Sequence, residues 1–349
     1  MWVEKLKDKD EFTRLEAVRE LQAIAMVAAA VRTVAPNAES QDLRPAVPAL
    51  SKALSDKSPH VRGGAAAALR AIGTEATQSL PSLAKAAEDS DKSVRMEAAA
   101  ALIVIGSVKH GQIGNRVLID LLKDTDSFVC CQAAQKLGEA GSKAAPAVPA
   151  LIDVLRHNRE SDPRVFAAQA LGGIGPEAKD AVALLCLGLK DMNRDVRLHC
   201  CQALGEICRD PKTCIGPLIQ ALQGEDDGIR VAACQALGRF QGDAKPALST
   251  LAKTLLNKDP NVRVSAAQAL RDIGPDASHC LRELVGALRD ANKDVRLFAA
   301  SALGKMGRDA RPAVPALRML LNDQDEFVRS EARSALDSIA KGVPGKDQD

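Results

Sequence analysis

The side chains with the greatest potential for chemistry are one histidine and four cysteines near the middle of the chain, which could bind a metal ion. They are His199, Cys200, Cys201, Cys208 and Cys214. Zinc sites use such side chains in characteristic short spacings, and this spacing matches none of them. Cys200 and Cys201 also occupy positions that are alanine where the same sequence pattern recurs. We therefore predict packing roles for these two cysteines, no metal site and no cofactor.

The other reactive side chains also lack the spacing that catalysis requires. The nine cysteines include the adjacent pair Cys130 and Cys131, but no C-x-x-C occurs. We therefore expect reduced thiols and a reducing compartment, which places the protein in the cytoplasm. Glycine-rich phosphate loops, Ser-His-Asp sets and H-E-x-x-H are absent. The sequence predicts no catalytic residue, and hence a protein that is not an enzyme.

Composition limits both the core and the partners of this protein. Aromatic residues make up 2% of the 349 and Tyr is absent, so small and aliphatic side chains must fill the interior. The net charge is +2, which provides no strong attraction for nucleic acid or an anionic membrane. The most apolar stretch, 21–31, is too short to span a bilayer. We expect neither a nucleic-acid partner nor a membrane protein, and the oligomeric state stays open.

One leucine marks a repeat that covers nearly the whole chain. It lies in a recurring A-x-A-L pattern, and its copies are Leu21, Leu69, Leu102, Leu137, Leu171, Leu204, Leu237, Leu270, Leu303 and Leu336. Successive copies are 33 to 35 residues apart, except for a first interval of 48. A fixed period of this size indicates stacked supersecondary units. We predict ten two-helix units that form a single solenoid over residues 1–340, followed by a short polar tail at 341–349.

Capping residues predict where the two helices of each unit begin. The first helix (helix A) often has proline in its first turn, where the nitrogen needs no helical acceptor, as at Pro48, Pro81, Pro149 and Pro315. The second helix (helix B) carries the marker leucine and follows a residue that can cap its N-terminus. These caps are Asp10, Ser58, Asp91, Asp126, Asn193, Asp226, Asp259, Asn292 and Asp325. In the fifth unit, Asp162 before Pro163 predicts a cap displaced toward the C-terminus.

The end of helix B and its packing face can also be predicted. Glycine is expected to end helix B in a left-handed conformation at Gly73, Gly106, Gly141, Gly175, Gly274 and Gly307. Three residues before the marker, every unit from Ala66 to Ala300 has Ala or Cys, which suits contact with a neighbouring unit. In the last unit this residue is Arg333, as expected of a terminal cap.

Two rows of opposite charge follow the same period. Arginine stands seven residues before the marker in every unit except the one with Cys130, as Arg14, Arg62, Arg95, Arg164, Arg197, Arg230, Arg263, Arg296 and Arg329. Aspartate stands thirteen residues before it as Asp8, Asp56, Asp89, Asp124, Asp191, Asp290 and Asp323. Stacking would let each arginine bridge the turn carboxylates of its own and the adjacent unit with bidentate geometry. We predict a structural role for this ladder.

The repeated segments from Asp91 to Arg95, Asp259 to Arg263 and Asp325 to Arg329, each followed by an alanine-rich helix, resemble HEAT repeats. Their short period is similar to that of the bacterial subgroup named after phycobilisome lyases. The resemblance covers residues 1–340 and implies an all-α, right-handed α-solenoid (α-α superhelix) of about ten HEAT-like hairpins. It also implies that helix A lies on the convex side and helix B on the concave side. The missing T-P-L-H motif argues against ankyrin repeats, and the missing Tyr against tetratricopeptide repeats.

The first unit departs from the regular pattern. The interval of 48 residues implies an insertion of 15 around residues 26–45, which we expect to lengthen the first helix B through Val34 and to add a loop from Pro36 to Arg44. The chain also begins within what should be the first helix A. We expect Trp2 to cover this open end, unless the chain is a fragment of a longer array.

The concave face is the expected binding surface, because side chains two, five and nine residues before the marker point away from the core. The first of these positions holds Gln135, Gln169, Gln202, Gln235 and Gln268. The other two hold Phe166, Phe298, Phe12, Phe128 and Phe327, which are five of the six phenylalanines. We predict that a protein partner binds in a groove lined by Phe166, Gln169, His199, Gln202, Gln235 and Phe298. Two other interpretations stay open, in which the phenylalanines cover inter-repeat loops and the glutamines form a solvated ladder.

The resemblance also suggests enzymatic alternatives to a scaffold that binds a protein partner. HEAT-like iron hydroxylases use His-Glu pairs, but no histidine here precedes a glutamate. DNA glycosylases with similar repeats would need a basic, aromatic concave face, which the glutamine row does not supply. A bilin-lyase-like role, as enzyme or accessory subunit, remains the strongest alternative, although fold does not determine function.

Overall fold

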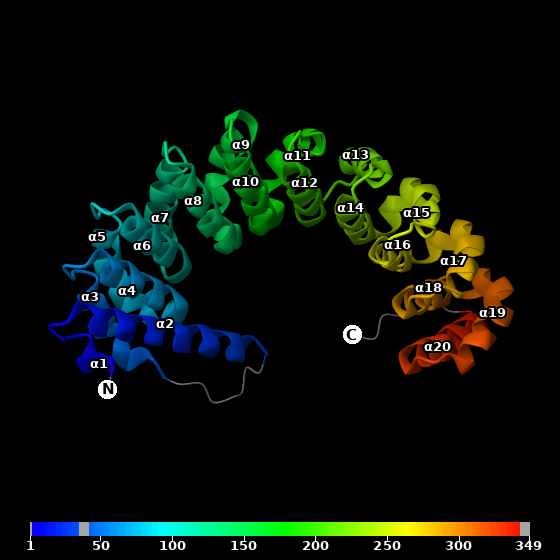
Figure 1. Ribbon diagram of the computed structural model, residues 1–349, viewed down its shortest axis with the longest axis horizontal. Helices are drawn as coiled ribbons and strands as arrows, with labels where there is room; N and C mark the ends of the chain where they lie inside the picture. Colours follow the sequence, from blue (N-terminus) through cyan, green and yellow to red (C-terminus); the bar gives the residue numbers. More distant parts are fainter. Residues whose placement is uncertain (1, 35–41, 343–349) are drawn as a thin grey trace. The chain divides into compact units, whose positions relative to one another are not determined.

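The computed structural model describes residues 2–34 and 42–342, and within these ranges it contains helices and turns but no strand (Figure 1). Short A helices alternate with longer B helices. The A helices are α1 (Trp2–Lys5), α3 (Val47–Ala53), α5 (Leu80–Ala86), α7 (Val108–Leu121), α9 (Val148–His157), α11 (Val182–Gly188), α13 (Lys212–Gln223), α15 (Leu248–Thr254), α17 (Leu281–Ala287) and α19 (Val314–Met319). The B helices are α2 (Glu11–Val34), α4 (Pro59–Ile72), α6 (Lys92–Ile105), α8 (Ser127–Glu139), α10 (Ser161–Ile174), α12 (Arg194–Ile207), α14 (Asp227–Arg239), α16 (Pro260–Ile273), α18 (Lys293–Lys305) and α20 (Glu326–Lys341).

Contacts divide the chain into two compact units, Met1–Ala178 and Lys179–Asp349. The first unit holds the hairpins from α1/α2 to α9/α10, and the second holds those from α11/α12 to α19/α20. Within each unit, most B helices pack closely against the B helix of the next hairpin, whereas neighbouring A helices meet at few points. The exception is α6, which packs mainly against α7 and meets α8 at few points. The chain is therefore an all-α solenoid. That the two units form one continuous solenoid over 1–340 stays a prediction.

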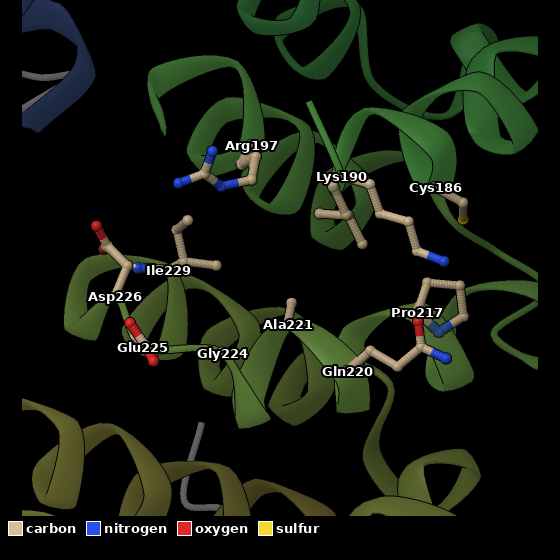
Figure 2. A pocket seen from close by; sticks show the side chains of 11 residues that line it. Cys186, Lys190, Arg197, Pro217, Gln220, Ala221, Gly224, Glu225, Asp226 and Ile229 are labelled. Atoms are coloured by element: carbon tan, nitrogen blue, oxygen red, sulfur yellow. Dashed lines mark hydrogen bonds between the residues drawn. The ribbon is translucent and has the colours of Figure 1, made fainter. Parts of the chain in front are cut away.

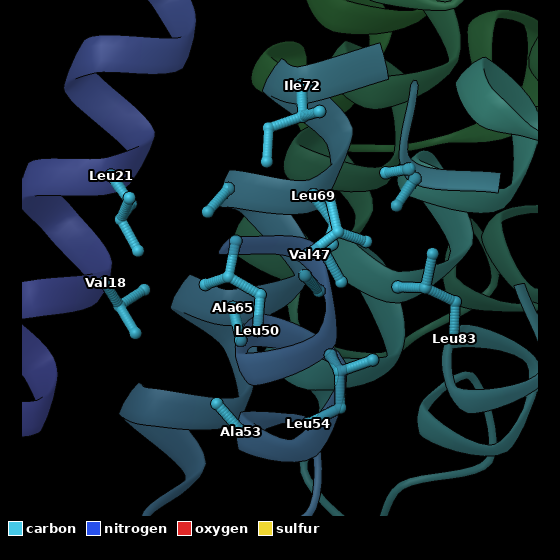
Figure 3. Packing of buried hydrophobic residues seen from close by; sticks show 14 of the residues in the cluster. Val18, Leu21, Val47, Leu50, Ala53, Leu54, Ala65, Leu69, Ile72 and Leu83 are labelled. Carbon is cyan, nitrogen blue, oxygen red and sulfur yellow. The ribbon is translucent and has the colours of Figure 1, made fainter. Parts of the chain in front are cut away.

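The marker leucines form the centre of the core. Nine of them are fully buried, and Leu336 in α20 is half-buried. In the first unit, Leu69 of α4 lies between Leu21 of α2 and Leu83 of α5, with Leu50 of α3 beside it (Figure 3). The small residues three positions before the marker are also fully buried from Ala66 to Ala300, while Arg333 is exposed. Aliphatic and small side chains thus form a core that contains almost no aromatic ring.

Short 3₁₀ helices link most hairpins. They are η1 (Arg44–Ala46), η2 (Gly73–Ser79), η3 (Gly141–Ala147), η4 (Gly175–Ala181), η5 (Gln241–Ala247), η6 (Gly274–Cys280), η7 (Gly307–Ala313) and, after α19, η8 (Leu320–Asn322). Five of the six glycines expected in the left-handed region have positive φ, between 58° and 80°. At Gly73, Gly175 and Gly274, however, ψ lies between −146° and −139°, so these three have positive φ without the left-handed helical ψ. Gly106 is the exception, with φ −79°. The left-handed prediction is wrong there because the chain continues directly into α7 in an extended conformation.

The N-terminal caps of the B helices mostly lie where the sequence predicts them, with two differences. Ser58 makes no side-chain capping bond, because its hydroxyl donates to Glu11 Oε1 at 2.6 Å. The prediction of a displaced cap in the fifth hairpin is also wrong, since α10 begins at Ser161 in the same register as the other B helices. There, Asn158 Oδ1 accepts from the Glu160 N–H at 3.0 Å and keeps the turn in its usual place.

The A helices differ in length, and α7 and α13 are the longest. α7 and α13 have 14 and 12 residues and follow the preceding B helix without a 3₁₀ helix. In the first hairpin, α1 is a single turn and α2 extends over 24 residues to Val34. Trp2 is partly buried and packs against the core cluster. The expected loop after α2 falls mostly on residues 35–41, which lie outside the described residues, as do residues 343–349 of the tail.

Glycines allow the B helices to approach one another closely. A Cβ atom on Gly138 of α8 would lie 2.9 Å from Ala170 Cα of α10, and one on Gly173 of α10 would lie 2.7 Å from Gly138 O. Gly205, Gly238 and Gly304 make equivalent close approaches to an alanine Cα of the next B helix, at 3.0 to 3.2 Å. At these glycines, the backbone of one B helix therefore packs directly on the backbone of the next B helix. We call the succession of B helices within a unit the B row.

Candidate functional site

The side chains first considered for chemistry do not form a reactive centre. Among the described residues, no three His, Cys, Asp or Glu side chains are grouped so that they could hold a metal ion. Cys200 and Cys201 lie in the core, and Cys208 and Cys214 form a disulfide between α12 and α13. This pair differs from the expectation of reduced thiols. Burial raises the pKa of Cys201 to about 12, which keeps this thiol protonated and unreactive near neutral pH.

The predicted arginine ladder includes four bidentate ion pairs between successive hairpins. Nε and Nη2 of the arginine donate to the carboxylate of the following hairpin at 2.7 to 2.9 Å in Arg14–Asp56, Arg62–Asp89, Arg263–Asp290 and Arg296–Asp323. Nη1 of each arginine donates to main-chain carbonyls of its own turn, such as Asp56 O for Arg62. The sequence predicted that each arginine would also contact a carboxylate of its own hairpin. In the structure, the arginine contacts backbone oxygens there instead.

Arg95, Arg230 and Arg329 of the ladder make other contacts in the structure. Lys92 pairs with the carboxylate of Asp124 at 2.7 Å, which the ladder pattern assigns to Arg95. Arg230 pairs with Asp227 of its own helix. Arg329 of α20 donates through Nη1 to Asp323 O and Gln324 O. Asp191 accepts from the Asn193 N–H at 2.8 Å, as the ladder aspartates do in other turns.

Replacing Asp89 by asparagine is expected to make stability less sensitive to acid. The Arg62 guanidinium lowers the pKa of Asp89 below its usual value, and burial opposes this only in part. A carboxyl group whose pKa is lower in the folded than in the unfolded state stabilises the fold at pH values above its unfolded-state pKa. This stabilisation is lost as the pH falls through the folded-state pKa. Urea unfolding between about pH 5 and pH 2 should therefore show a shallower pH dependence for Asp89→Asn than for the parent.

The matched control for this test is Asp337→Asn, which changes an exposed carboxylate of α20. It should reproduce the pH dependence of the parent. Equal slopes for the parent and for Asp89→Asn would show that the ladder carboxylate does not contribute to acid sensitivity.

The outward surface of the B helices in the first unit is crossed by ion pairs. Arg70 of α4 contacts Glu139 of α8 at 2.9 Å, and Lys136 of α8 contacts Glu97 of α6 at 2.8 Å. The predicted groove residues of this unit both lie on α10. Phe166 is half-buried and Gln169 is exposed. The remaining four predicted groove residues belong to the second unit, and a groove that includes all six stays a prediction.

The outward surface of the B helices in the second unit also has ion pairs, Arg239–Glu206 and Arg271–Asp272, and it carries the other predicted residues. His199 Nδ1 lies 2.9 Å from Gln202 Oε1 on α12, and Gln235 is exposed on α14. Phe298 of α18 is half-buried, and the guanidinium carbon of Arg271 from α16 lies 4.8 Å from its ring centroid. Phe12, Phe128 and Phe327 are 81%, 68% and 63% exposed, and the interpretation that these rings cover inter-repeat loops stays open.

A pocket of about 390 Å³ opens between the α11/α12 and α13/α14 hairpins. Figure 2 shows Arg197 extending from α12 over one end of the opening, above the turn that carries Glu225 and Asp226. Lys190 points toward Pro217 and Gln220 at the other end. Asp226 pairs with Arg194 at 2.6 Å. The pocket thus combines a guanidinium, an amine and an apolar wall.

Sequence reasoning missed this pocket and a second row of ion pairs, Arg194–Asp226 and Lys293–Asp325, which also link successive hairpins. The signal for the pocket was in the period: thirteen residues before Leu237, the ladder position is Gly224. The sequence also contained a signal for the second row, because Arg194 and Lys293 are both positively charged and both stand ten residues before a marker leucine.

No helix within residues 2–34 and 42–342 has the length and apolar character of a membrane-spanning segment. This is the structural counterpart of the absence of a long apolar stretch in the sequence.

Comparison with known proteins adds the family. A family model described as HEAT repeats matches overlapping segments of the chain, at residues 2–103, 80–172, 148–215, 182–259, 215–285 and 248–337. An engineered protein solved by the Northeast Structural Genomics Consortium is 26% identical, with a TM-score of 0.55 over 97% of this chain and 98% of that one. Kap121p is similar in fold, at 16% identity and a TM-score of 0.55 over 97% of this chain and 45% of Kap121p. No curated protein matches the sequence. Because the matched segments extend over nearly the whole sequence, the chain belongs to the HEAT-repeat family.

Proposed function

We propose that this protein is a non-catalytic scaffold that binds a protein partner through the outward side chains of its B helices in the second unit. We call this surface the B-face and define it by His199, Gln202, Gln235, Arg271 and Phe298. The observation that carries the proposal is a half-buried aromatic ring held against an arginine on successive B helices of a HEAT solenoid, with Gln202 and Gln235 exposed on other B helices of the same unit.

The chemistry of the B-face suits a protein interface. Phenylalanine and arginine are enriched in the parts of interfaces that contribute most of the binding energy. The contact between Arg271 and Phe298 holds the ring in place, which reduces the conformational entropy that binding would cost. Gln202 on α12 and Gln235 on α14 offer uncharged donors and acceptors on other B helices of the same unit. An apolar anchor together with neutral amides favours a polypeptide over a polyanion such as nucleic acid.

Several features support a non-catalytic role. The buried thiols are protonated near neutral pH, since burial raises the pKa of Cys234 to about 12 and that of Cys130 to about 11. The second pair of groove residues, Phe166 and Gln169, lies on α10 of the first unit and is proposed to contact the partner independently. We further propose that the repeats belong to the short phycobilisome-lyase-like subgroup, because most marker leucines are 33 residues apart. We also propose that the protein acts in the cytoplasm, because seven of its nine cysteines are free thiols despite the disulfide between Cys208 and Cys214.

Phe298→Ser is expected to weaken binding of the partner at least tenfold, as loss of an aromatic anchor does at other interfaces. Partners are first identified by affinity purification with the parent chain from the native host and quantitative mass spectrometry. The affinity of each purified partner for the parent and for Phe298→Ser is then measured by calorimetry.

The matched control is Leu256→Ser, which changes a side chain that is 80% exposed and lies at the end of an A helix. It should leave the affinity unchanged. If every purified partner binds Phe298→Ser as tightly as the parent while circular dichroism shows an intact fold, the B-face is not the binding surface.

A further inference from the structure

The ladder of turn side chains is interrupted at one hairpin of the second unit. Thirteen residues before the marker, the other nine hairpins have a side chain that can accept hydrogen bonds. These residues are Asp8, Asp56, Asp89, Asp124, Asn158, Asp191, Asn257, Asp290 and Asp323. The hairpin of α13 and α14 has Gly224 instead. The pocket between α11 and α13 opens at this glycine.

In complete turns, the aspartate gathers three donors. Asp290 accepts from Arg263 Nε at 2.7 Å, from Arg263 Nη2 at 2.9 Å and from the Asn292 N–H at 2.8 Å. Asp323 has the same arrangement with Arg296 and the Asp325 N–H. One carboxylate therefore satisfies the forked edge of an arginine and a backbone amide together.

The same donors are present around Gly224. Arg197 Nη1 donates to Asp191 O at 2.8 Å and to Met192 O at 3.0 Å, as Arg263 Nη1 does to Asn257 O and Lys258 O. Within the described residues, no carboxylate accepts from Arg197 Nε or Nη2, and no acceptor meets the Asp226 N–H. The carboxylate of Asp226 is already held by Arg194 at 2.6 Å.

The backbone does not explain the glycine. Gly224 has φ −62° and ψ 177°, close to φ −61° and ψ 149° at Asp323, and such angles are open to any residue. A Cβ atom at Gly224 would lie 3.2 Å from Ala221 O, which requires a shift of a few tenths of an ångström. The turn thus keeps the conformation of a complete ladder position and lacks only the side chain.

We propose that this pocket binds the carboxylate of an aspartate or glutamate side chain from a partner polypeptide, which takes the place that an aspartate of this chain occupies in other hairpins. Arg197 Nε and Nη2 and the Asp226 N–H are its three donors. Lys190 adds a second positive charge, while Glu225 repels a run of acidic residues. The apolar wall of Leu189, Pro217 and Ile229 favours apolar neighbours on either side of the acidic residue.

This inference deepens the proposed function, since the ligand is a segment of a protein partner, but it uses a surface other than the B-face. The two proposals can therefore fail separately. Phe298→Ser changes the B-face and leaves this pocket intact, whereas the variants described next change the pocket and leave the B-face intact.

The test measures binding of the peptide acetyl-Ala-Leu-Asp-Leu-Ala-amide to the full chain. It follows the NMR signals of the Arg197 Nε–H and the Asp226 N–H and compares an otherwise identical peptide with asparagine. We expect the aspartate peptide to shift both signals and to bind about tenfold more tightly than the asparagine peptide, because a charged bidentate pair replaces a neutral contact.

Gly224→Asp places the missing carboxylate within the chain and is expected to abolish peptide binding while it keeps or raises stability. Gly224→Ala controls for the added Cβ atom and should retain binding. Arg197→Lys keeps the charge, removes the fork and should weaken binding severalfold. Equal binding of the two peptides to the parent, or unchanged binding to Gly224→Asp, would overturn the proposal. So would unchanged binding to Arg197→Lys.

Discussion

Leu270→Ala is expected to lower the free energy of unfolding by about 3–5 kcal/mol, the range for fully buried leucines whose removal leaves a cavity. Leu270 is a marker leucine of α16 and is fully buried. The closely packed α14 and α18 on either side limit how far the core can collapse into the space. Urea unfolding followed by far-UV circular dichroism measures the loss.

Leu256→Ala provides the control in the same hairpin. This side chain is 80% exposed, so its truncation should change stability by less than about 0.5 kcal/mol. A loss below about 1 kcal/mol for Leu270→Ala, within the range of ordinary substitutions, would contradict a core centred on the marker leucines.

Gly173→Ala is expected to destabilise the first unit by about 1–3 kcal/mol, the usual cost of forcing extra atoms into a packed interior. The added Cβ would lie 2.7 Å from Gly138 O and 3.1 Å from Gly138 Cα, which are backbone atoms of α8 and cannot rotate away. The two helices must move apart to admit it. This cost should outweigh the gain of about 1 kcal/mol from replacing glycine within a helix.

Gly111→Ala, in α7, makes the opposite prediction with the same chemical change. No atom lies within 4 Å of a Cβ at this position, so only the helical preference of alanine remains and stability should rise by about 0.5–1 kcal/mol. Thermal unfolding of the two variants should therefore shift in opposite directions. Shifts of the same sign would contradict the close approach of α8 and α10.

The period of the marker leucine was enough to predict the hairpins, because a repeat needs the same apolar residue at the same place in each unit. The capping residues located most helix ends for a similar reason, since their side chains act on the nearest turn of backbone. Gly106 and Asp162 misled because the same residue type also occurs in extended connections and inside a first helical turn. Single residues cannot distinguish these cases without the length of the linker that follows.

The candidate site was less predictable. Phe298 was found from its register, but its contact with Arg271 depends on two different helices and could not be inferred from one helix alone. The pocket at Gly224 was missed because the ladder was defined by the aspartates that it contains. A glycine at the same register then looks like an ordinary turn residue. The disulfide between Cys208 and Cys214 depends on how the chain turns between α12 and α13, which no local pattern specifies.

The uneven packing of the two helix rows has a mechanical consequence within each unit. Along the B row, backbone touches backbone at the glycines, so separating neighbouring B helices would break many van der Waals contacts at once. Neighbouring A helices touch at few points, so spreading them apart is the softer deformation. A ligand that enters between α11 and α13 can therefore widen the gap at a small elastic cost while the B row keeps its spacing.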